Sequence, residues 1–390
     1  MIDQVGIAVL GAGYWGRKLV SEYLAAERRG NAILLKVCDP SVAALDALLL
    51  TKETSAVGRA RLTQKIMDVM DDPEISGVHI ATPSPSHYKI AKMALERGKN
   101  VLVEKPMTLK PYESHELVDL ARANNLVLKV GHIFRFNTAL QVARRIIRLG
   151  ELGRLFYVRV QWTDQASFPD RDIIFDLGPH PVDILNQLLG TWPLQVNGIT
   201  RAYRGSGGEV AYLVAEFPCD IFAHIEMSWL HPNKVREVTV VGSSQTLVVD
   251  CLRQQVFRIG RETREEVVIS ANNTIESEIN DFVESIVQRD TSSESGLIGA
   301  HTVDVLEKIS RSMWARPLPV VLMPNLGGAM QPNSASSLEP SNAESPIGRV
   351  QLKHPGYRDV KMLTQRESPK ILARERDDSD SQSYHRNLFR

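Results

Sequence analysis

The sequence has few cysteines, no surplus of charge of either sign and no long apolar run. Cys38, Cys219 and Cys251 lie far apart and form no CxxC pair, so they indicate neither a disulfide framework nor a zinc knuckle. The 46 Lys and Arg residues balance the 46 Asp and Glu residues, which argues against nucleic acid or an acidic membrane as the main partner. No segment reaches the roughly 18 apolar residues that a membrane-spanning helix needs. We therefore expect a protein of the reducing cytoplasm that binds a small molecule.

The first part of the chain, residues 1–131, alternates short apolar runs with amphipathic stretches. Strands of this kind, separated by helices, predict a parallel sheet that is covered on both faces, which is a doubly wound α/β domain. The predicted strands are Val5–Leu10, Ile33–Cys38, Gly77–Ala81, Asn100–Val103 and Val127–Gly131. The predicted helices between them are Tyr14–Glu27, Val42–Leu50, Gln64–Met70, Ser86–Arg97 and Pro111–Asn124.

The second part, residues 132–323, changes rhythm and predicts an α+β domain. Strand-like runs follow one another across short turns such as residues 205–208, as expected of a mainly antiparallel sheet. The predicted strands are Leu155–Thr163, Leu194–Tyr203, Val210–Phe217, Ile221–Trp229, Val235–Gly242 and Thr246–Asp250. The predicted helices are Asn137–Gly150, Pro179–Leu189, Glu276–Gln288 and Gly299–Met313.

The last segment, residues 324–390, is rich in Ser, Pro, Asn, Gln and mixed charge and poor in patterned apolar residues. Such a composition buries too little apolar surface to offset the entropy of ordering the chain. We predict a disordered tail, in which residues 368–377 could form a helix on binding a partner.

The first strand runs directly into the glycine motif Gly11-Ala12-Gly13-Tyr14-Trp15-Gly16, which opens a predicted helix. In this strand-loop-helix setting Gly11 permits the tight turn, Gly13 lets the backbone approach a pyrophosphate, and Gly16 lets helix and strand pack closely. The helix N-terminus then offers N–H groups and a partial positive charge to the anion. The motif predicts a dinucleotide site, in which Tyr14 and Trp15 shape the loop.

Asp39 ends the second predicted strand, where an acidic side chain accepts hydrogen bonds from the adenosine ribose hydroxyls. A carboxylate there also repels a 2′-phosphate, so we expect NAD rather than NADP. The alternative is that Asp39 only opens the Asp39-Pro40-Ser41 turn.

Two further strand ends carry polar side chains. Thr82, Pro83 and His87 follow the third strand, and Glu104 and Lys105 follow the fourth. Ligands of open parallel sheets bind outside the carboxyl ends of the strands, so these residues are candidates for cofactor contacts. For His87, a structural role at a helix start is an equal alternative.

These motifs, in this order, resemble the signatures of the Gfo/Idh/MocA oxidoreductases, and the similarity covers about residues 5–321. The resemblance implies a Rossmann domain, a second domain whose open sheet mediates oligomerisation, a nicotinamide cofactor and a carbohydrate substrate. A homodimer or homotetramer is expected on the same ground. The matching residues are Gly11–Gly16, Ala81-Thr82-Pro83 with His87, Glu104-Lys105-Pro106 and Asp176-Leu177-Gly178-Pro179-His180.

Within that family, Asp172–His180 and Ser228-Trp229-Leu230 with Lys234-Val235-Arg236 are similar to a subgroup that includes nucleotide-sugar 3-dehydrogenases. The resemblance implies oxidation of a ring hydroxyl, at C3, of a sugar such as a UDP-activated amino sugar.

Three residues are candidates for the chemistry. An ammonium at Lys105 can stabilise alkoxide character on the reacting oxygen. Asp176 and His180 are four residues apart across a helix start and can share one face, with His180 as proton acceptor and Asp176 orienting the imidazole or the substrate. In the family the matching Lys, Asp and His play these parts. Taken singly, each residue also has a purely structural alternative. Lys105 could form a solvated ion pair with Glu104, Asp176 could be a helix N-cap, and His180 could be a partly buried helix residue.

Four more residues are predicted to line a sugar pocket: Arg135, Asn137, Trp162 and Asp183. Arg135 suits a carboxylate or diphosphate, and Trp162 could stack on a sugar face. His180 and Asp183 invite a metal, but a third ligand is not evident, so we expect none.

Other functions remain open beside the sugar dehydrogenase. One is an inositol or polyol dehydrogenase, and another is a glycoside hydrolase that oxidises C3 transiently with NAD and regenerates the cofactor. A third is a cofactor-binding regulator without chemistry, because fold alone does not fix function. Lys105, Asp176 and His180 argue against the regulator.

Overall fold

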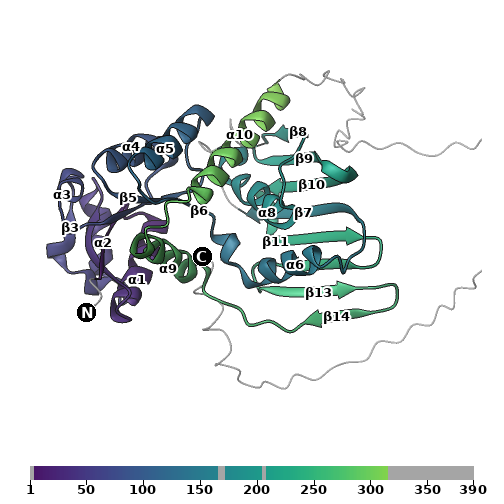
Figure 1. The fold of residues 1–390 in the computed structure, drawn as a ribbon, viewed down its shortest axis with the longest axis horizontal. Helices are drawn as coiled ribbons and strands as arrows, with labels where there is room; N and C mark the ends of the chain where they lie inside the picture. Colours follow the sequence, from purple (N-terminus) through teal and green to yellow (C-terminus); the bar gives the residue numbers. More distant parts are fainter. Residues whose placement is uncertain (1–3, 166–171, 204–207, 315–390) are drawn as a thin grey trace, which may run out of the picture. The chain divides into compact units, whose positions relative to one another are not determined.

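A computed structural model of the chain describes residues 4–165, 172–203 and 208–314 (Figure 1). These residues belong to one compact unit. The predicted tail at residues 324–390 and its predicted helix at 368–377 lie outside the described residues.

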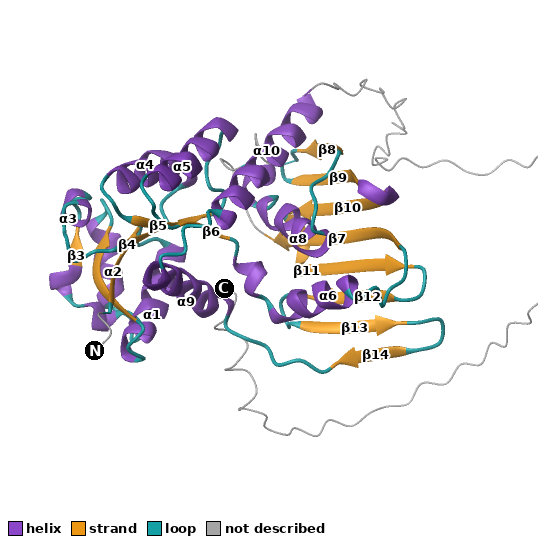
Figure 2. Cartoon of the chain, in the orientation of Figure 1, coloured by secondary structure: helices purple, strands orange, loops and turns teal. Residues whose placement is uncertain are grey.

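The first sheet is six-stranded and parallel, in the order β3-β2-β1-β4-β5-β6. The chain reverses its direction of winding between β1 and β4, which are neighbours at the centre of the sheet. Figure 2 labels β4, β5 and β6, which continue the sheet from β1 to one edge. Doubly wound sheets bind their ligands at such a switch point, outside the carboxyl ends of the strands. The strands are β1 (Val5–Leu10), β2 (Ala32–Cys38), β3 (Leu62–Thr63), β4 (Gly77–Ile80), β5 (Asn100–Glu104) and β6 (Leu128–Gly131).

Both faces of this sheet are buried, which explains its continuous apolar strands. In β1, Ile7 and Val9 pack with α1 on one face, while Ala8 and Leu10 join the core under α4 and α5 on the other. The helices are α1 (Tyr14–Arg28), α2 (Val42–Leu49), α3 (Met67–Met70), α4 (His87–Glu96) and α5 (Pro111–Ala123), with short turns η1 (Ser55–Val57), η2 (Arg59–Arg61) and η3 (Ser84–Ser86).

The helix predicted from Gln64 to Met70 is shorter than expected. Leu62–Thr63 form strand β3, and the Thr63 hydroxyl accepts a hydrogen bond from the backbone N–H of Lys65 at 3.0 Å. Such side-chain turns compete with helix formation, so only Met67–Met70 is helical.

The second sheet has eight strands in the order β14-β13-β12-β11-β7-β10-β9-β8. All neighbours are antiparallel except β10 and β7, so the sheet is mixed and mostly antiparallel. Its strands are β7 (Leu155–Gln165), β8 (Gln195–Arg201), β9 (Val210–Phe217), β10 (Ile221–Ser228), β11 (Leu230–Gly242), β12 (Thr246–Asp250), β13 (Gln255–Ile259) and β14 (Arg264–Val267).

The strands β13 and β14 were not predicted. β14, with the sequence Arg-Glu-Glu-Val, lies at the sheet edge and is exposed along most of its length, so it lacks the alternation that marks a half-buried strand. The parallel pairing of β10 with β7 was also not predicted, because it joins segments far apart in sequence.

One face of the second sheet is covered by α6 (Thr138–Arg148) and α8 (Pro179–Leu189), whose apolar side chains share one core with β7, β9, β10 and β11. The short elements η4 (Ile133–Phe136), α7 (Ile173–Asp176) and η5 (Pro218–Asp220) complete this part of the chain. Within the described ranges, no helix has both the length and the apolar character needed to cross a membrane.

The last two helices return to the first sheet. α9 (Thr274–Gln288) contacts α1 and β1, and Ile279 and Phe282 join the core beneath them. α10 (Glu294–Trp314) contacts α5 and β6 as well as α8 and β8. Residues of α9 and α10, which follow the second sheet in the sequence, therefore help to build the core of the first sheet. The predicted domain division at residue 131 stays a prediction.

Candidate active site

The glycine motif forms an open loop between β1 and α1. Gly11 has a φ of +105°, and a Cβ on it would lie 2.6 Å from the carbonyl oxygen of Ala81. A Cβ on Gly16 would lie 1.9 Å from the carbonyl oxygen of Gly11, whereas a Cβ on Gly13 would meet nothing within 4 Å. Gly13 is also the N-cap of α1 and provides no side-chain cap. The helix start therefore has space above Gly13 in which a phosphate group fits.

Asp39 lies at the end of β2 beside this loop. Its Oδ2 accepts a hydrogen bond from the Ala12 N–H at 2.7 Å, and its Oδ1 accepts one from the Ser41 N–H at 2.8 Å. Asp39 thus opens the turn and also joins it to the glycine loop. The half-buried carboxylate lies where the sequence predicts the ribose site, and its direct contact with the ribose stays a prediction.

His87 is buried, with 1% of its surface exposed, and connects two loops. Its Nδ1 lies 2.9 Å from the Pro106 carbonyl oxygen and its Nε2 lies 2.8 Å from the Thr82 carbonyl oxygen. Burial lowers its pKa, although both carbonyls act in the opposite direction. This placement favours the structural interpretation of His87. Of the two neighbouring candidates, Thr82 is half-buried and Pro83 is exposed.

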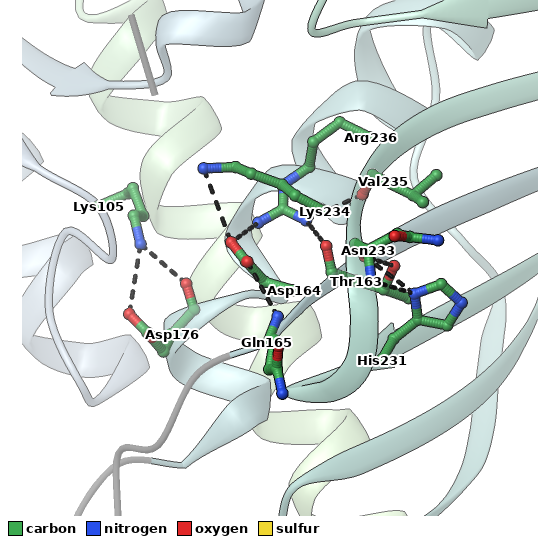
Figure 3. Close-up of polar contacts among 10 residues, drawn as sticks. All are labelled: Lys105, Thr163, Asp164, Gln165, Asp176, His231, Asn233, Lys234, Val235 and Arg236. Atoms are coloured by element: carbon green, nitrogen blue, oxygen red, sulfur yellow. Dashed lines mark hydrogen bonds and ion pairs between the residues drawn. The ribbon is translucent and has the colours of Figure 1, made fainter. Parts of the chain in front are cut away.

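Lys105 and Asp176 come together from different parts of the chain (Figure 3). The Lys105 ammonium donates to the Asp176 carbonyl oxygen at 2.8 Å and lies 3.5 Å from Asp176 Oδ1. Lys105 follows β5 and Asp176 ends α7. About a fifth of each side chain is exposed, 20% for Lys105 and 22% for Asp176, so both remain accessible to a ligand.

His180 lies in the first turn of α8, packed against aromatic rings. Its ring centre is 5.1 Å from that of Phe134 and 5.7 Å from that of Trp162. Burial, followed by the positive charges of Lys105 and Arg236, lowers its pKa well below 6.5. His180 is therefore neutral at ordinary pH, and its pKa is lower than the sequence suggested. Lys105, Asp176 and His180 occupy one region, because Lys105 pairs with Asp176 and influences His180.

Trp162 and Arg236 form a wall beside His180. The Arg236 guanidinium lies 4.9 Å from the Trp162 ring centre, donates to the Thr163 carbonyl oxygen and lies 3.4 Å from Asp164 Oδ2. Burial lowers the pKa of Arg236 to about 10. Trp162 is fully buried, and its stacking on a sugar face stays a prediction. Its ring supports Arg236 and His180.

The other predicted pocket residues are engaged inside the protein. Asn137 caps α6 by accepting from the Leu140 N–H, and its amide donates to the Cys251 carbonyl oxygen. Asp183, 1% exposed, accepts from the Arg135 Nε at 2.6 Å. Asn137 and Asp183 are both 1% exposed, and their contact with a sugar stays a prediction. Arg135 keeps 22% of its side chain exposed, but its guanidinium is committed to α8.

Sequence reasoning did not assign a role to Lys234 and Arg236. Both belong to β11 and lie two residues apart, so they point to the same face of the strand. The Lys234 ammonium lies 3.6 Å from Asp164 Oδ2, and Figure 3 shows both basic groups converging on this carboxylate. The spacing of two cations on one strand face was the available signal.

The fold and these contacts define a nicotinamide-dependent oxidoreductase: an open glycine loop at a switch point, an acidic residue at the end of β2, and a lysine and a histidine beside the strand ends. Residues 5–132 match the family described as "Oxidoreductase family, NAD-binding Rossmann fold", and residues 140–248 match its C-terminal domain. The chain belongs to the Gfo/Idh/MocA oxidoreductase family.

Three relatives illustrate the family. The scyllo-inositol 2-dehydrogenase (NAD(+)) of Bacillus subtilis is 28% identical over 65% of this chain and 76% of its own. The UDP-N-acetylglucosamine 3-dehydrogenase of Acidithiobacillus ferrooxidans is 26% identical over 71% of this chain and 87% of its own. The solved structure of a levoglucosan dehydrogenase in complex with NADH and levoglucosan shares the fold, with 19% identity, a TM-score of 0.71, and coverage of 80% of this chain and 98% of that one.

Proposed function

We propose that the protein oxidises a ring hydroxyl of a sugar to a ketone with NAD as the oxidant, and that C3 of a UDP-activated amino sugar is the target. The observation that carries the proposal is the Lys105–Asp176 pair beside a neutral His180 at the carboxyl ends of the first sheet's strands. A binding protein without chemistry would not require these three groups near a dinucleotide loop.

NAD, when bound, supplies the acceptor for the hydride of the carbinol carbon. The glycine loop and Asp39 hold the dinucleotide. His180, neutral at its lowered pKa, accepts the proton of the reacting hydroxyl. Lys105 donates a hydrogen bond to the same oxygen and stabilises its negative charge as the O–H bond breaks. Asp176 holds the ammonium in position. The products are a ketone, a reduced nicotinamide and one proton.

The identity of the substrate follows the relatives. A UDP-N-acetylglucosamine 3-dehydrogenase matches most of its own length to this chain, which supports a nucleotide-sugar substrate. The scyllo-inositol 2-dehydrogenase supports a polyol as the second candidate. Both substrates present a ring carbinol, so the same three side chains serve either reaction.

The test is a panel of UDP-amino sugars, inositols and free sugars, each incubated with NAD while the absorbance of reduced nicotinamide is recorded. The proposal predicts stoichiometric reduction with a UDP-amino sugar. Reduction with inositol alone would overturn the nucleotide-sugar assignment. Release of a free sugar without net reduction would instead identify a hydrolase that regenerates its cofactor.

We further propose that the chain forms a homodimer or homotetramer through the outer face of the second sheet, defined as Tyr157, Ile199, Tyr212, Val214 and Phe222. These side chains are 42–49% exposed and lie on the adjacent strands β7, β10, β9 and β8. The registers place Phe222 beside Tyr157 and Tyr212 beside Ile199, and Val214 lies next to Tyr212 on the same face of β9, with exposed Glu216 and His224 among these side chains. A cluster of exposed apolar side chains with polar neighbours supports a protein–protein contact.

A further inference from the structure

Beneath the glycine loop lies a buried polar cluster that the reaction described above does not use. It consists of His79 on β4, Glu104 on β5 and Glu278 on α9, which are 0%, 7% and 2% exposed. One nitrogen or oxygen atom of each lies within 4.8 Å of those of the other two. The cluster adjoins Lys105 in sequence and Trp15 in space, so it supports both the reacting lysine and the nucleotide loop.

Glu104 is held by donors on several sides. The Trp15 indole N–H donates to its Oε1, and the Lys105 backbone N–H donates to its Oε2 at 3.3 Å. His79 Nε2 lies 3.5 Å from Oε1, and a Cβ at Gly131 would come within 2.8 Å of Oε2. Burial raises the pKa of Glu104, but His79 and Trp15 outweigh it and leave the pKa below its ordinary value. Glu104 is therefore the ionised member of the cluster.

Glu278 is in the opposite situation. Neither of its carboxylate oxygens has a hydrogen-bond partner among the described residues. Burial, then the charges of Glu104, Asp281 and Asp183, raise its pKa well above the ordinary value, and Lys129, whose ammonium is paired with Asp281, lowers it by less. The groups facing Glu278 are Glu104, Asp281, Asp183, Lys129, His79 and Tyr23. An ionised carboxylate there would be buried beside three others of the same sign.

We propose that Glu278 is a neutral carboxylic acid whose O–H is directed at the Glu104 carboxylate, and that this pair is a positioning device for Lys105 and Trp15. The two carboxylates lie within 4.8 Å of each other and share no hydrogen bond in the described structure, so a small side-chain adjustment brings them into contact. The inference deepens the proposed function and rests on it only for its kinetic part. Glu278 acts through Glu104 and does not touch cofactor or substrate. In this way α9 helps to fix the position of Lys105, which follows β5.

A proton explains the cluster better than a metal ion. The Tyr23 hydroxyl lies 3.2 Å from His79 Nδ1, so it can donate there and leave the proton on His79 Nε2. That nitrogen lies 3.5 Å from Glu104 Oε1 without a hydrogen bond among the described residues. The Trp15 indole and the Lys105 backbone N–H already donate hydrogen bonds to the Glu104 carboxylate. In the proposed pair, the acid proton of Glu278 is a further donor to the same carboxylate. A divalent cation would have to displace these donors.

The test compares Glu278→Gln with Glu278→Met in the full-length protein. Gln keeps a neutral donor toward Glu104, whereas Met fills similar space without one. We expect Gln to retain the wild-type kcat and NAD affinity. Met should lose about tenfold or more in both, the usual effect of removing a hydrogen bond to a charged group. Thermal unfolding should show that the Met variant is folded, because an apolar side chain is tolerated in a buried site.

Infrared spectroscopy supplies a readout that is independent of the substrate. At neutral pH the wild type should show the carbonyl stretch of a protonated carboxylic acid, which both variants lack. Glu276→Gln, on the same helix in an exposed ion pair with Arg29, is the matched control and should keep the band. Raising the pH should remove the band as Glu278 ionises and should lower wild-type NAD affinity reversibly, but not that of Glu278→Gln.

Three results would overturn the inference: a neutral-pH spectrum without the acid band, Glu278→Met with unchanged NAD affinity and kcat, or Glu278→Gln as impaired as Met. A stoichiometric divalent metal in the purified protein, lost in Glu278→Gln, would replace the proton with a metal site. If no sugar or polyol is oxidised, the proposed function fails while the band and the NAD affinities still decide the role of Glu278.

Discussion

At the scale of single residues, the environment of His180 determines how it can work. Its ring is packed against Phe134 and Trp162, with Lys105 and Arg236 near enough to disfavour a second positive charge. A histidine in this setting stays neutral across the physiological range, which is the form that accepts a proton, and the same surroundings make it a weaker base than a free imidazole. The imidazolium formed in the reaction would be short-lived for the same reason.

Replacing His180 by Ala should lower kcat by about 10²–10⁴-fold, the range that general base catalysis provides, and leave the NAD dissociation constant unchanged. Steady-state kinetics and NAD titration of the same preparation measure both. His115→Ala changes a partly exposed histidine on α5 and should leave turnover at the wild-type level. Full activity in the His180 variant would remove this residue from the mechanism.

The pH dependence of kcat/KM gives a separate prediction. Because the pKa of His180 is lowered well below 6.5, its neutral form persists as the pH falls through 6.5. The acidic limb of the profile should therefore lie well below pH 6.5, and activity should be flat between that pH and neutrality. An acidic limb centred at 6.5 that is lost in His180→Ala would contradict the lowered pKa.

Asp39 should set the preference for NAD over NADP. Asp39→Asn removes the charge that repels a 2′-phosphate and keeps one acceptor for the loop N–H of Ala12. We expect NAD affinity to fall by about tenfold, the effect of one hydrogen bond to a charged group, and the ratio of kcat/KM for NAD to that for NADP to fall further. Asp46→Asn, an equal charge change on α2, is the control, and an unchanged ratio in Asp39→Asn would refute the role.

The residues that sequence reasoning found are those whose function has a local pattern. The glycine motif, Lys105 and Asp176 stand beside predicted strand or helix ends, and the structure brings Lys105 and Asp176 together. Glu278 was missed, although it stands on the apolar stripe of α9, three residues after Ile275 and four before Phe282. A carboxylate on an apolar helix stripe indicates a buried ionisable group. The sequence alone does not show which residue lies opposite that carboxylate.

At the scale of elements, the glycine loop has to leave space for the cofactor and also has to pack closely, and substitutions at two glycines separate these requirements. Gly13→Ala places a methyl group in open space, so the free energy of unfolding should change by less than about 1 kcal/mol. NAD affinity should nevertheless fall by at least about tenfold, because the methyl group occupies the approach of the pyrophosphate. Gly16→Ala should instead destabilise the fold by about 1–3 kcal/mol, because its Cβ collides with the Gly11 carbonyl.

Chemical denaturation and NAD titration distinguish the two variants. Gly13→Ala with wild-type NAD affinity would show that the cofactor does not pass over this residue. Gly16→Ala with wild-type stability would show that the loop accommodates the methyl group with no loss in the free energy of unfolding.

Strands and helices with clear periodicity were predicted to within a few residues, and the exceptions have physical causes. β9 alternates buried and exposed side chains and was predicted with its observed ends. β14 is an exposed edge strand of charged residues, which reads as a loop. The pairing of β10 with β7 depends on which strands meet after folding, and no local pattern records it.

At the scale of the whole molecule, the second sheet has two unlike faces. One is covered by α6 and α8, and the other carries the outer face of Tyr157, Ile199, Tyr212, Val214 and Phe222. A sheet whose uncovered face exposes several large apolar side chains is suited to association, because exposed apolar patches favour protein–protein contacts. The same sheet positions Trp162 and Arg236 on its inner side, so the side chains beside His180 and the proposed contact lie on opposite faces of one sheet.

Phe222→Lys tests this association. Phe222 lies near the start of β10, between Tyr157 on β7 and Glu216 on β9, and a Lys there places a charge in the contact. We expect the wild type to sediment as a dimer or tetramer and the variant to dissociate, since loss of an aromatic side chain from such a contact weakens it by about 2 kcal/mol or more. Leu50→Lys changes an 84% exposed apolar residue at the end of α2 and should leave the assembly intact.

NAD affinity should be the same in the wild type and in both variants, because the glycine loop belongs to the other sheet. If Phe222→Lys remains fully assembled at micromolar concentration, the outer face is not the interface; if the wild type is a monomer, the proposed homo-oligomer is wrong.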